Sequence, residues 1–131
     1  METRSQSEAY AELGMGLIRD EDLLSHIRES DATIVFLSSD LEKRAKGRAV
    51  LAECEKVPAR YRWAVPCDFT VTVYEPNVER LDPDQLRILI LHELLHVGID
   101  RDGNEERYSI IPHDVEEFRE ILDRYGARWA E

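Results

Sequence analysis

Residues 84–100 read DQLRILILHELLHVGID and place His92, Glu93 and His96 inside an otherwise aliphatic run. The three residues form the pattern H-E-x-x-H. Two histidines four residues apart lie on one face of an α-helix, so their imidazole nitrogens can converge on one cation, and the glutamate between them points at the space beside it. The stretch therefore predicts a metal site of the hydrolytic kind.

The residues around this stretch predict where its helix begins and ends. Asp82 is a good N-cap, Pro83 suits the first helical position, and Gln85 completes a capping-box-like pair with Asp82. Gly98 stands where a left-handed residue would end the helix. We therefore expect the helix to begin near Pro83 and to stop near Val97.

The expected helix has a wide apolar surface, which predicts a central and largely buried position. Two histidines and a glutamate would be costly to desolvate there unless they face a cleft or bind a ligand. The alternative is an ordinary amphipathic helix with two surface histidines, and the aliphatic surroundings favour the metal-binding interpretation. The apolar positions are Leu86, Ile90, Leu91, Leu94, Leu95 and Val97.

Composition limits the class of protein and the class of partner. With 131 residues, 43% of them hydrophobic and 34% charged, the chain is expected to form a single soluble domain over 1–131. The net charge of −11 argues against nucleic acid, since affinity for phosphates depends on Lys and Arg. A basic patch at Lys43, Arg44, Lys46 and Arg48 is interpreted as a solvated turn.

Neither a secretory leader nor a membrane-spanning run stands out in the sequence. The longest apolar run is the one that His92, Glu93 and His96 interrupt. We therefore expect a cytoplasmic protein with no membrane partner, and the sequence leaves its oligomeric state open. Cys54 and Cys67 lack C-x-x-C spacing, so they are expected to be reduced and packed.

Short runs of β-branched and aromatic residues predict two or three strands before the helix. Residues 33–38 (TIVFLS) resemble a buried strand, and residues 69–74 (FTVTVY) alternate like a strand with one buried face. Residues 49–57 are ambiguous between helix and strand and are interpreted as a strand. Residues 59–67 resemble an irregular connection that Trp63 would anchor. The result is an α+β fold, with a small, mostly antiparallel sheet packed on helices.

The first part of the chain is expected to be helical. Residues 5–28 begin with Ser5 and Glu8 at capping-box spacing, and Gly14 and Gly16 weaken the middle, so two helical segments are expected. His26 lies in this region without a second ligand near it in sequence. We interpret it as a surface or packing histidine.

The last part of the chain carries the candidates for a third metal ligand. Residues 100–107 are expected to form a polar loop, and a D-x-x-E capping box at Asp114 and Glu117 predicts a final helix that ends near Gly126. His113 would stand at the start of that helix, where it is free to reach back and complete a three-ligand site. A side chain facing solvent is the alternative for His113.

The segments LILHELLHVGID and IIPHDVEEFREILDRYGARW resemble the putative phage metallopeptidase family, small zincin-like proteins of phages and prophages. The resemblance is densest over 68–129. It implies a zincin-like fold, a bound zinc ion, and Glu93 as the catalytic carboxylate. The zinc ligands that it implies are His92, His96 and His113, and the competitors for the third position are Asp114, Glu116 and Glu117.

The function expected from the residues and the resemblance is zinc-dependent hydrolysis of a peptide bond in a peptide or protein substrate. Glu93 would act as the general base, and the strand over 69–74 would align an extended substrate if it lies at the sheet edge. One alternative is a non-catalytic zinc-binding module with a structural or interaction role in a phage or prophage. Another is a zinc hydrolase that acts on a non-peptide amide.

Overall fold

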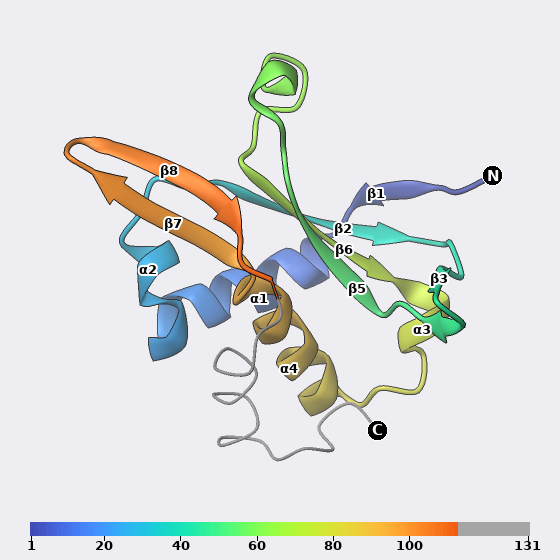
Figure 1. The fold of residues 1–131 in the computed structure, drawn as a ribbon. Coiled ribbons are helices and arrows are strands. Elements are labelled where there is room, and N and C mark those ends of the chain that lie inside the picture. The colour runs from blue at the N-terminus through green and yellow to red at the C-terminus, as the bar shows by residue number, and fades with distance from the viewer. Residues whose placement is uncertain (113–131) are drawn as a thin grey trace.

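The computed structural model describes residues 1–112 of the chain, in which helices and strands combine as an α+β fold (Figure 1). The main sheet has four strands in the spatial order β1-β2-β6-β5. β2 (Ile34–Ser39) and β6 (Phe69–Tyr74) are parallel, whereas β1 (Arg4–Gln6) and β5 (Ala52–Lys56) join them antiparallel. The expected α+β class with a small, mostly antiparallel sheet is therefore confirmed, and β5 is shorter than the predicted run over 49–57.

α1 and α4 lie against one face of this sheet. α1 contacts α4 and β2, and α4 contacts β5 and β6. Apolar side chains on that face of the strands, including Phe36, Val71 and Val73, form the core together with both helices. The helices are α1 (Glu8–Asp20), α2 (Ser25–Arg28), α3 (Glu75–Val78) and α4 (Pro83–Leu94).

The N-terminal region contains two helical segments, as expected, but they begin and break elsewhere. Ser7 rather than Ser5 caps α1, and its hydroxyl accepts a hydrogen bond from the backbone N–H of Tyr10. Ser5 is unavailable as a cap because it pairs with Ser38 in the sheet. α1 runs unbroken through Gly14 and ends at Asp20, where a short 3₁₀ turn leads to α2.

β6 lies inside the sheet, and both of its faces are buried. This corrects the expectation of one buried face: Thr72 and Tyr74 point away from the helices and are nevertheless almost fully buried. Arg4 and Lys43 lie 5.8 and 5.5 Å from the centre of the Tyr74 ring, and the Tyr74 hydroxyl donates a hydrogen bond to Glu53. Long charged side chains thus cover the sheet where the described part of the chain places no second layer of helices.

Two hairpins extend from this body. β3 (Arg44–Ala45) and β4 (Arg48–Ala49) enclose Lys46 and Gly47, both with positive φ, so the basic patch is a turn as predicted. The expected polar loop over 100–107 is instead the hairpin of β7 (Val97–Asp102) and β8 (Glu105–Ile110). Its residues are polar because the hairpin is exposed, and ion pairs such as Arg107 with Asp102 stabilise it across the strands.

The irregular connection between β5 and β6 is held at its base. Trp63 does not anchor it, since this side chain is 86% exposed. The anchors are the buried Cys67 and an ion pair between Arg62 and the buried Asp68. Cys67 and the half-buried Cys54 are both free thiols, as expected.

No helix within residues 1–112 is long and apolar enough to cross a lipid bilayer. The helix predicted to start at Asp114 lies outside the described residues.

Gly14 allows α1 to approach the sheet closely, which leads to a testable difference between two neighbouring glycines. A Cβ at Gly14 would overlap the ring of Phe36, whereas at Gly16 the nearest atom is Nη2 of Arg19 at 3.9 Å. Gly14→Ala should lower the free energy of unfolding by about 1–2 kcal/mol, because overpacking outweighs the gain in helix propensity. Gly16→Ala should raise it by about 0.5–1 kcal/mol.

Urea denaturation of both variants and of the wild type measures these two changes. Equal stabilisation by the two alanines would show that the contact between Gly14 and Phe36 does not limit the packing of α1.

Candidate metal centre

α4 begins as the sequence predicts. The side chain of Asp82 accepts a hydrogen bond from the backbone N–H of Gln85 at 2.8 Å, and the side chain of Gln85 accepts one from the backbone N–H of Asp82 at 3.0 Å. This reciprocal pair is a full capping box, and Pro83 occupies the first helical position. α4 then runs into the core, where Ile90, Leu91 and Leu94 are fully buried.

α4 ends one turn earlier than predicted. It stops at Leu94, and Val97 already belongs to β7. His92 and Glu93 therefore lie in the last helical turn, while His96 lies in the connection that follows. The backbone N–H of His96 donates to the carbonyl of Glu93 at 3.1 Å, so the chain tightens into a 3₁₀-type turn before it becomes extended.

Gly98 explains why the helix does not continue. It is not a left-handed helix terminus, as the sequence suggested, but a buried residue in β7 that pairs with Ser109 of β8. A Cβ at this position would overlap the hydroxyl of Ser109 and lie 3.0 Å from the Ser109 carbonyl oxygen. The close approach of β8 therefore requires glycine here, and pairing with β8 draws the chain out of the helix.

The rings of His92 and His96 remain close despite the early end of the helix. Their centroids are 5.0 Å apart and their planes make an angle of 84°. Zn–N bonds of about 2.1 Å place each ring centroid about 3.2 Å from the metal, so two tetrahedral imidazole ligands have centroids about 5 Å apart. The spacing of the two rings is thus compatible with a shared zinc ion.

The orientation of the His96 ring is set by the residue after β8. Nδ1 of His96 lies 2.6 Å from the carbonyl oxygen of Ile111. Because a carbonyl oxygen only accepts, Nδ1 must carry the proton, and in the neutral ring the lone pair is on Nε2. Metal-binding histidines commonly donate their second ring N–H in this way. The sequence gives no sign of this contact, because it joins His96 to a backbone group on another element.

His26 has a packing role, as expected. Its Nε2 donates to the carbonyl oxygen of Val97 at 2.9 Å and so links α2 to the first residue of β7.

A pocket of about 360 Å³ opens beside Glu93 and His96. Glu93, His92 and His96 are 6%, 6% and 8% exposed, and of these three side chains Glu93 and His96 line the pocket. β5 forms one wall of the pocket, and the chain around Ile110 contributes another. The lining residues are Val50, Ala52, Glu53, Cys54, Glu93, His96, Ile110 and Pro112.

Two polar residues of β5 in this pocket were not identified from the sequence. Burial raises the pKa of the Cys54 thiol, and the charges of Glu93 and Glu55 raise it further, so Cys54 stays protonated at neutral pH. Burial on its own would raise the pKa of the Glu53 carboxyl, but hydrogen bonds from Lys43 and Tyr74 outweigh it and lower that pKa. Glu53 and Cys54 are adjacent in β5, so their side chains lie on opposite faces of the sheet, and no sequence spacing connects either residue to His92.

The described residues do not supply a complete set of metal ligands. No group of three His, Cys, Asp or Glu side chains within 1–112 is arranged to hold a metal ion. His113 and its competitors Asp114, Glu116 and Glu117 lie outside the described residues. The described chain ends at Pro112, which lines the same pocket as Glu93 and His96.

Another pocket, of about 440 Å³, lies between α1, α2 and β2. Its lining is largely apolar and includes Met15, Ile18 and Ile34, with no His, Cys, Asp or Glu among the lining residues. It therefore offers no side-chain ligand for a catalytic metal.

Comparison with known proteins identifies a family. The family model described as "Putative phage metallopeptidase" matches residues 3–131. No curated protein and no solved structure matches the chain. The family description implies a metal ion as cofactor and a peptide or protein as substrate. Since the match covers nearly the whole sequence, the chain belongs to the putative phage metallopeptidase family.

Proposed function

We propose that this protein is a zinc-dependent peptidase of zincin-like fold, in which His92, His96 and His113 hold the metal ion and Glu93 is the general base. One observation carries the proposal. The rings of His92 and His96 have the spacing of two ligands of one ion, and His96 is oriented by its bond to Ile111. The family membership independently supports a metal-dependent peptidase.

The donor set fits zinc. Imidazole nitrogens are preferred zinc ligands, and three protein ligands leave a fourth position for water or substrate. A bound zinc ion would supply Lewis acidity, which polarises a peptide carbonyl and makes water acidic enough to lose a proton near neutral pH. His113 is proposed as the third ligand because Pro112, its neighbour in the sequence, lines the pocket.

Glu93 is suited to proton transfer. It follows His92 directly in α4 and lines the pocket while its side chain is largely shielded from solvent. Its carboxylate accepts a proton from the attacking water and donates a proton to the nitrogen of the leaving amine. Glu53 also lines the pocket, but its carboxylate is bound by Lys43 and Tyr74 on the outer face of the sheet, and these hydrogen bonds lower its pKa.

The strand that aligns the substrate is β5. The sequence suggested the strand over 69–74, but that strand is β6, which is paired on both sides. β5 is an edge strand of the four-stranded sheet within the described residues, and four of the pocket residues lie on it or just before it. β8 contacts β5, so the part of this edge that is proposed for the substrate is the part that β8 does not cover. An extended peptide can bind to such an edge through backbone hydrogen bonds.

Replacing Glu93 by Gln tests the proposed base. Glu93→Gln keeps the size of the side chain but cannot take a proton, so kcat on casein or on a mixed peptide library should fall by about 10²- to 10⁴-fold. Zinc content, measured by mass spectrometry of the metal, should stay at the wild-type level.

Glu55→Gln is the matched control. It replaces the same side chain by the same amide, but Glu55 lies on the outer face of β5 and does not line the pocket. Full activity of Glu93→Gln would contradict the role of Glu93. Zinc binding without turnover by the wild type on any peptide would favour the non-catalytic module.

The four histidines of the chain allow the metal ligands to be separated from a packing histidine. His92→Ala, His96→Ala and His113→Ala should each weaken zinc binding by at least about 100-fold, because each removes a ligand. His26→Ala should leave zinc affinity nearly unchanged, since His26 bonds to a backbone carbonyl. Competition with a chromophoric chelator measures the affinity, and circular dichroism checks that each variant is folded.

If His113→Ala binds zinc with wild-type affinity, the third ligand is not His113 and would be Asp114, Glu116 or Glu117. If both His92→Ala and His96→Ala bind zinc with wild-type affinity, the proposed metal site is wrong.

A further inference from the structure

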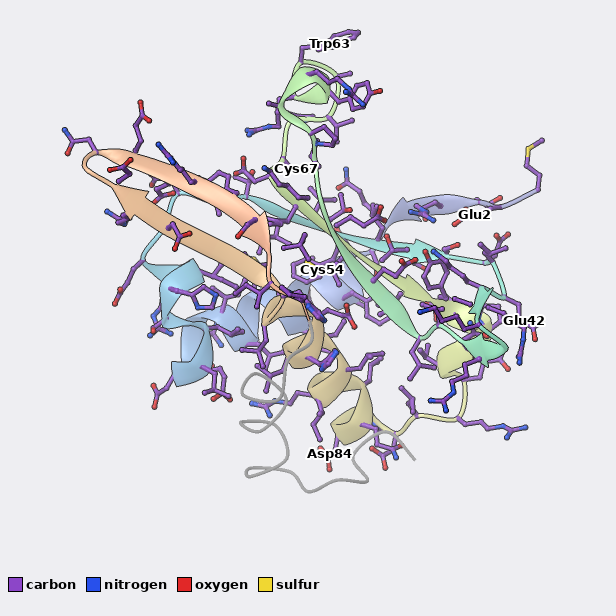
Figure 2. The ribbon with its side chains drawn as sticks, in the orientation of Figure 1. Glu2, Glu42, Cys54, Trp63, Cys67 and Asp84 are labelled. Carbon is purple, nitrogen blue, oxygen red and sulfur yellow. The ribbon has the colours of Figure 1, made fainter. Side chains whose placement is uncertain are left out.

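The connection between β5 and β6 carries an exposed aromatic surface that the proposed chemistry does not use. We call residues 58–66 the aromatic loop; it rises from the sheet away from α1 and α4 (Figure 1). The side chains of Tyr61, Trp63 and Val65 are 48%, 86% and 41% exposed. Trp63 lies at the outer end of the loop and points into solvent (Figure 2). Tryptophan and tyrosine are enriched at interfaces, because each combines a large apolar ring with a polar group.

The aromatic loop differs in charge from the rest of the protein. Its sequence, PARYRWAVP, contains two arginines and no acidic residue, in a chain with 28 acidic and 17 basic residues. Arg62 pairs with Asp68 at the base of the loop, whereas Arg60 is exposed and lies 4.9 Å from the centre of the Tyr61 ring. The outer surface of the loop therefore combines two aromatic rings with one cation.

The loop is held in a defined shape. The backbone N–H of Val65 donates to the carbonyl of Tyr61 at 2.8 Å, and the N–H of Tyr61 donates to the carbonyl of Pro58 at 2.9 Å. The buried Cys67 fixes the end of the loop that leads to β6. A surface ordered in advance loses little conformational entropy on binding, and Trp, Tyr and Arg are the residue types that contribute most at interfaces.

The position of the loop relates it to the candidate metal centre. Cys54 lines the pocket with Glu93 and His96, and the loop begins four residues further along the chain, at Pro58. A strand rises by about 3.3 Å per residue, so the start of the loop lies about 13 Å along β5 from the pocket. An extended peptide on the edge of β5 would reach the loop about four to six residues from the bond that is cleaved.

We propose that the aromatic loop is a distal binding site for the substrate of the proposed peptidase and selects a segment with apolar side chains and a carboxylate. The inference rests on the proposed function, because it assumes that a peptide substrate lies along the edge of β5 and reaches both the pocket and the aromatic loop. Arg60 supplies the attraction for the carboxylate, and the rings of Tyr61 and Trp63 supply the apolar contact. Nucleic acids and anionic membranes are disfavoured, because the protein has a net charge of −11 and the loop offers few cations.

The test uses a library of random dodecamer peptides and zinc-loaded Glu93→Gln protein, which binds peptides without cleaving them. Selected peptides should be enriched in Asp or Glu together with apolar residues. Trp63→Ala or Arg60→Ala, each added to Glu93→Gln, should weaken their binding by about 10- to 30-fold. Met15→Ala is the control, because it removes an exposed apolar side chain from α1.

Arg60→Glu gives a readout that a structural role would not change. It should reverse the preference of the selected peptides from Asp or Glu to Lys or Arg. In the active protein, Trp63→Ala should lower kcat/KM for a selected dodecamer by the same 10- to 30-fold. It should leave kcat/KM unchanged for a peptide shortened to the residues beside the cleaved bond.

The outcomes separate this inference from the proposed function. Peptide binding that depends on Trp63 and Arg60, without cleavage by the wild type, would support the loop as a peptide site and contradict the peptidase proposal. Cleavage and binding that are equal in the wild type and the loop variants would overturn the inference and leave the peptidase intact. Unchanged peptide preference in Arg60→Glu would also overturn it.

Discussion

Two hydrogen bonds between His96 and Ile111 fix the geometry of the candidate metal centre. The ring of His96 donates through Nδ1 to the carbonyl oxygen of Ile111, and the backbone N–H of Ile111 donates to the carbonyl oxygen of His96. One bond orients the imidazole and the other joins the backbone after α4 to the backbone after β8. Together they bring Pro112 to the wall of the pocket that Glu93 lines. They hold the ring of His96 and the backbone of Ile111 against each other.

Pairing between β7 and β8 also explains why only two residues separate α4 from the β7–β8 hairpin. α4 ends at Leu94 because Val97 is already paired with Ile110, and the absence of a side chain at Gly98 lets Ser109 approach. His96 thus occupies a tight turn between two regular elements. Its ring lies 5.0 Å from that of His92, so the two rings are neighbours although His96 is outside the helix.

The sequence predicted the elements with strong local signals. β6 was located to the residue, β2 within one residue at each end, and the capping box of Asp82 marked the start of α4, because alternation and capping are properties of neighbouring residues. The predictions from the sequence were wrong where the structure depends on contacts between segments that are far apart in the chain. Gly98 resembles a helix terminus until β8 is known to pack on it, and residues 100–107 resemble a loop because the hairpin is exposed. The order of the strands, which makes β5 an edge strand, has no local signature.

For the candidate site, the motif identified His92, Glu93 and His96, and the structure adds Cys54 and Ile111. Long-range ¹H–¹⁵N correlation spectra of the histidine side chains, recorded with and without zinc, would report which nitrogen of each ring carries a proton and which nitrogen binds the metal. We expect His96 to be protonated at Nδ1. Zinc should shift the signals of Nε2 of His96 and of the ring of His92, and it should leave those of His26 unchanged. Protonation of His96 at Nε2, or no response of His92 and His96 to zinc, would contradict the proposed metal site.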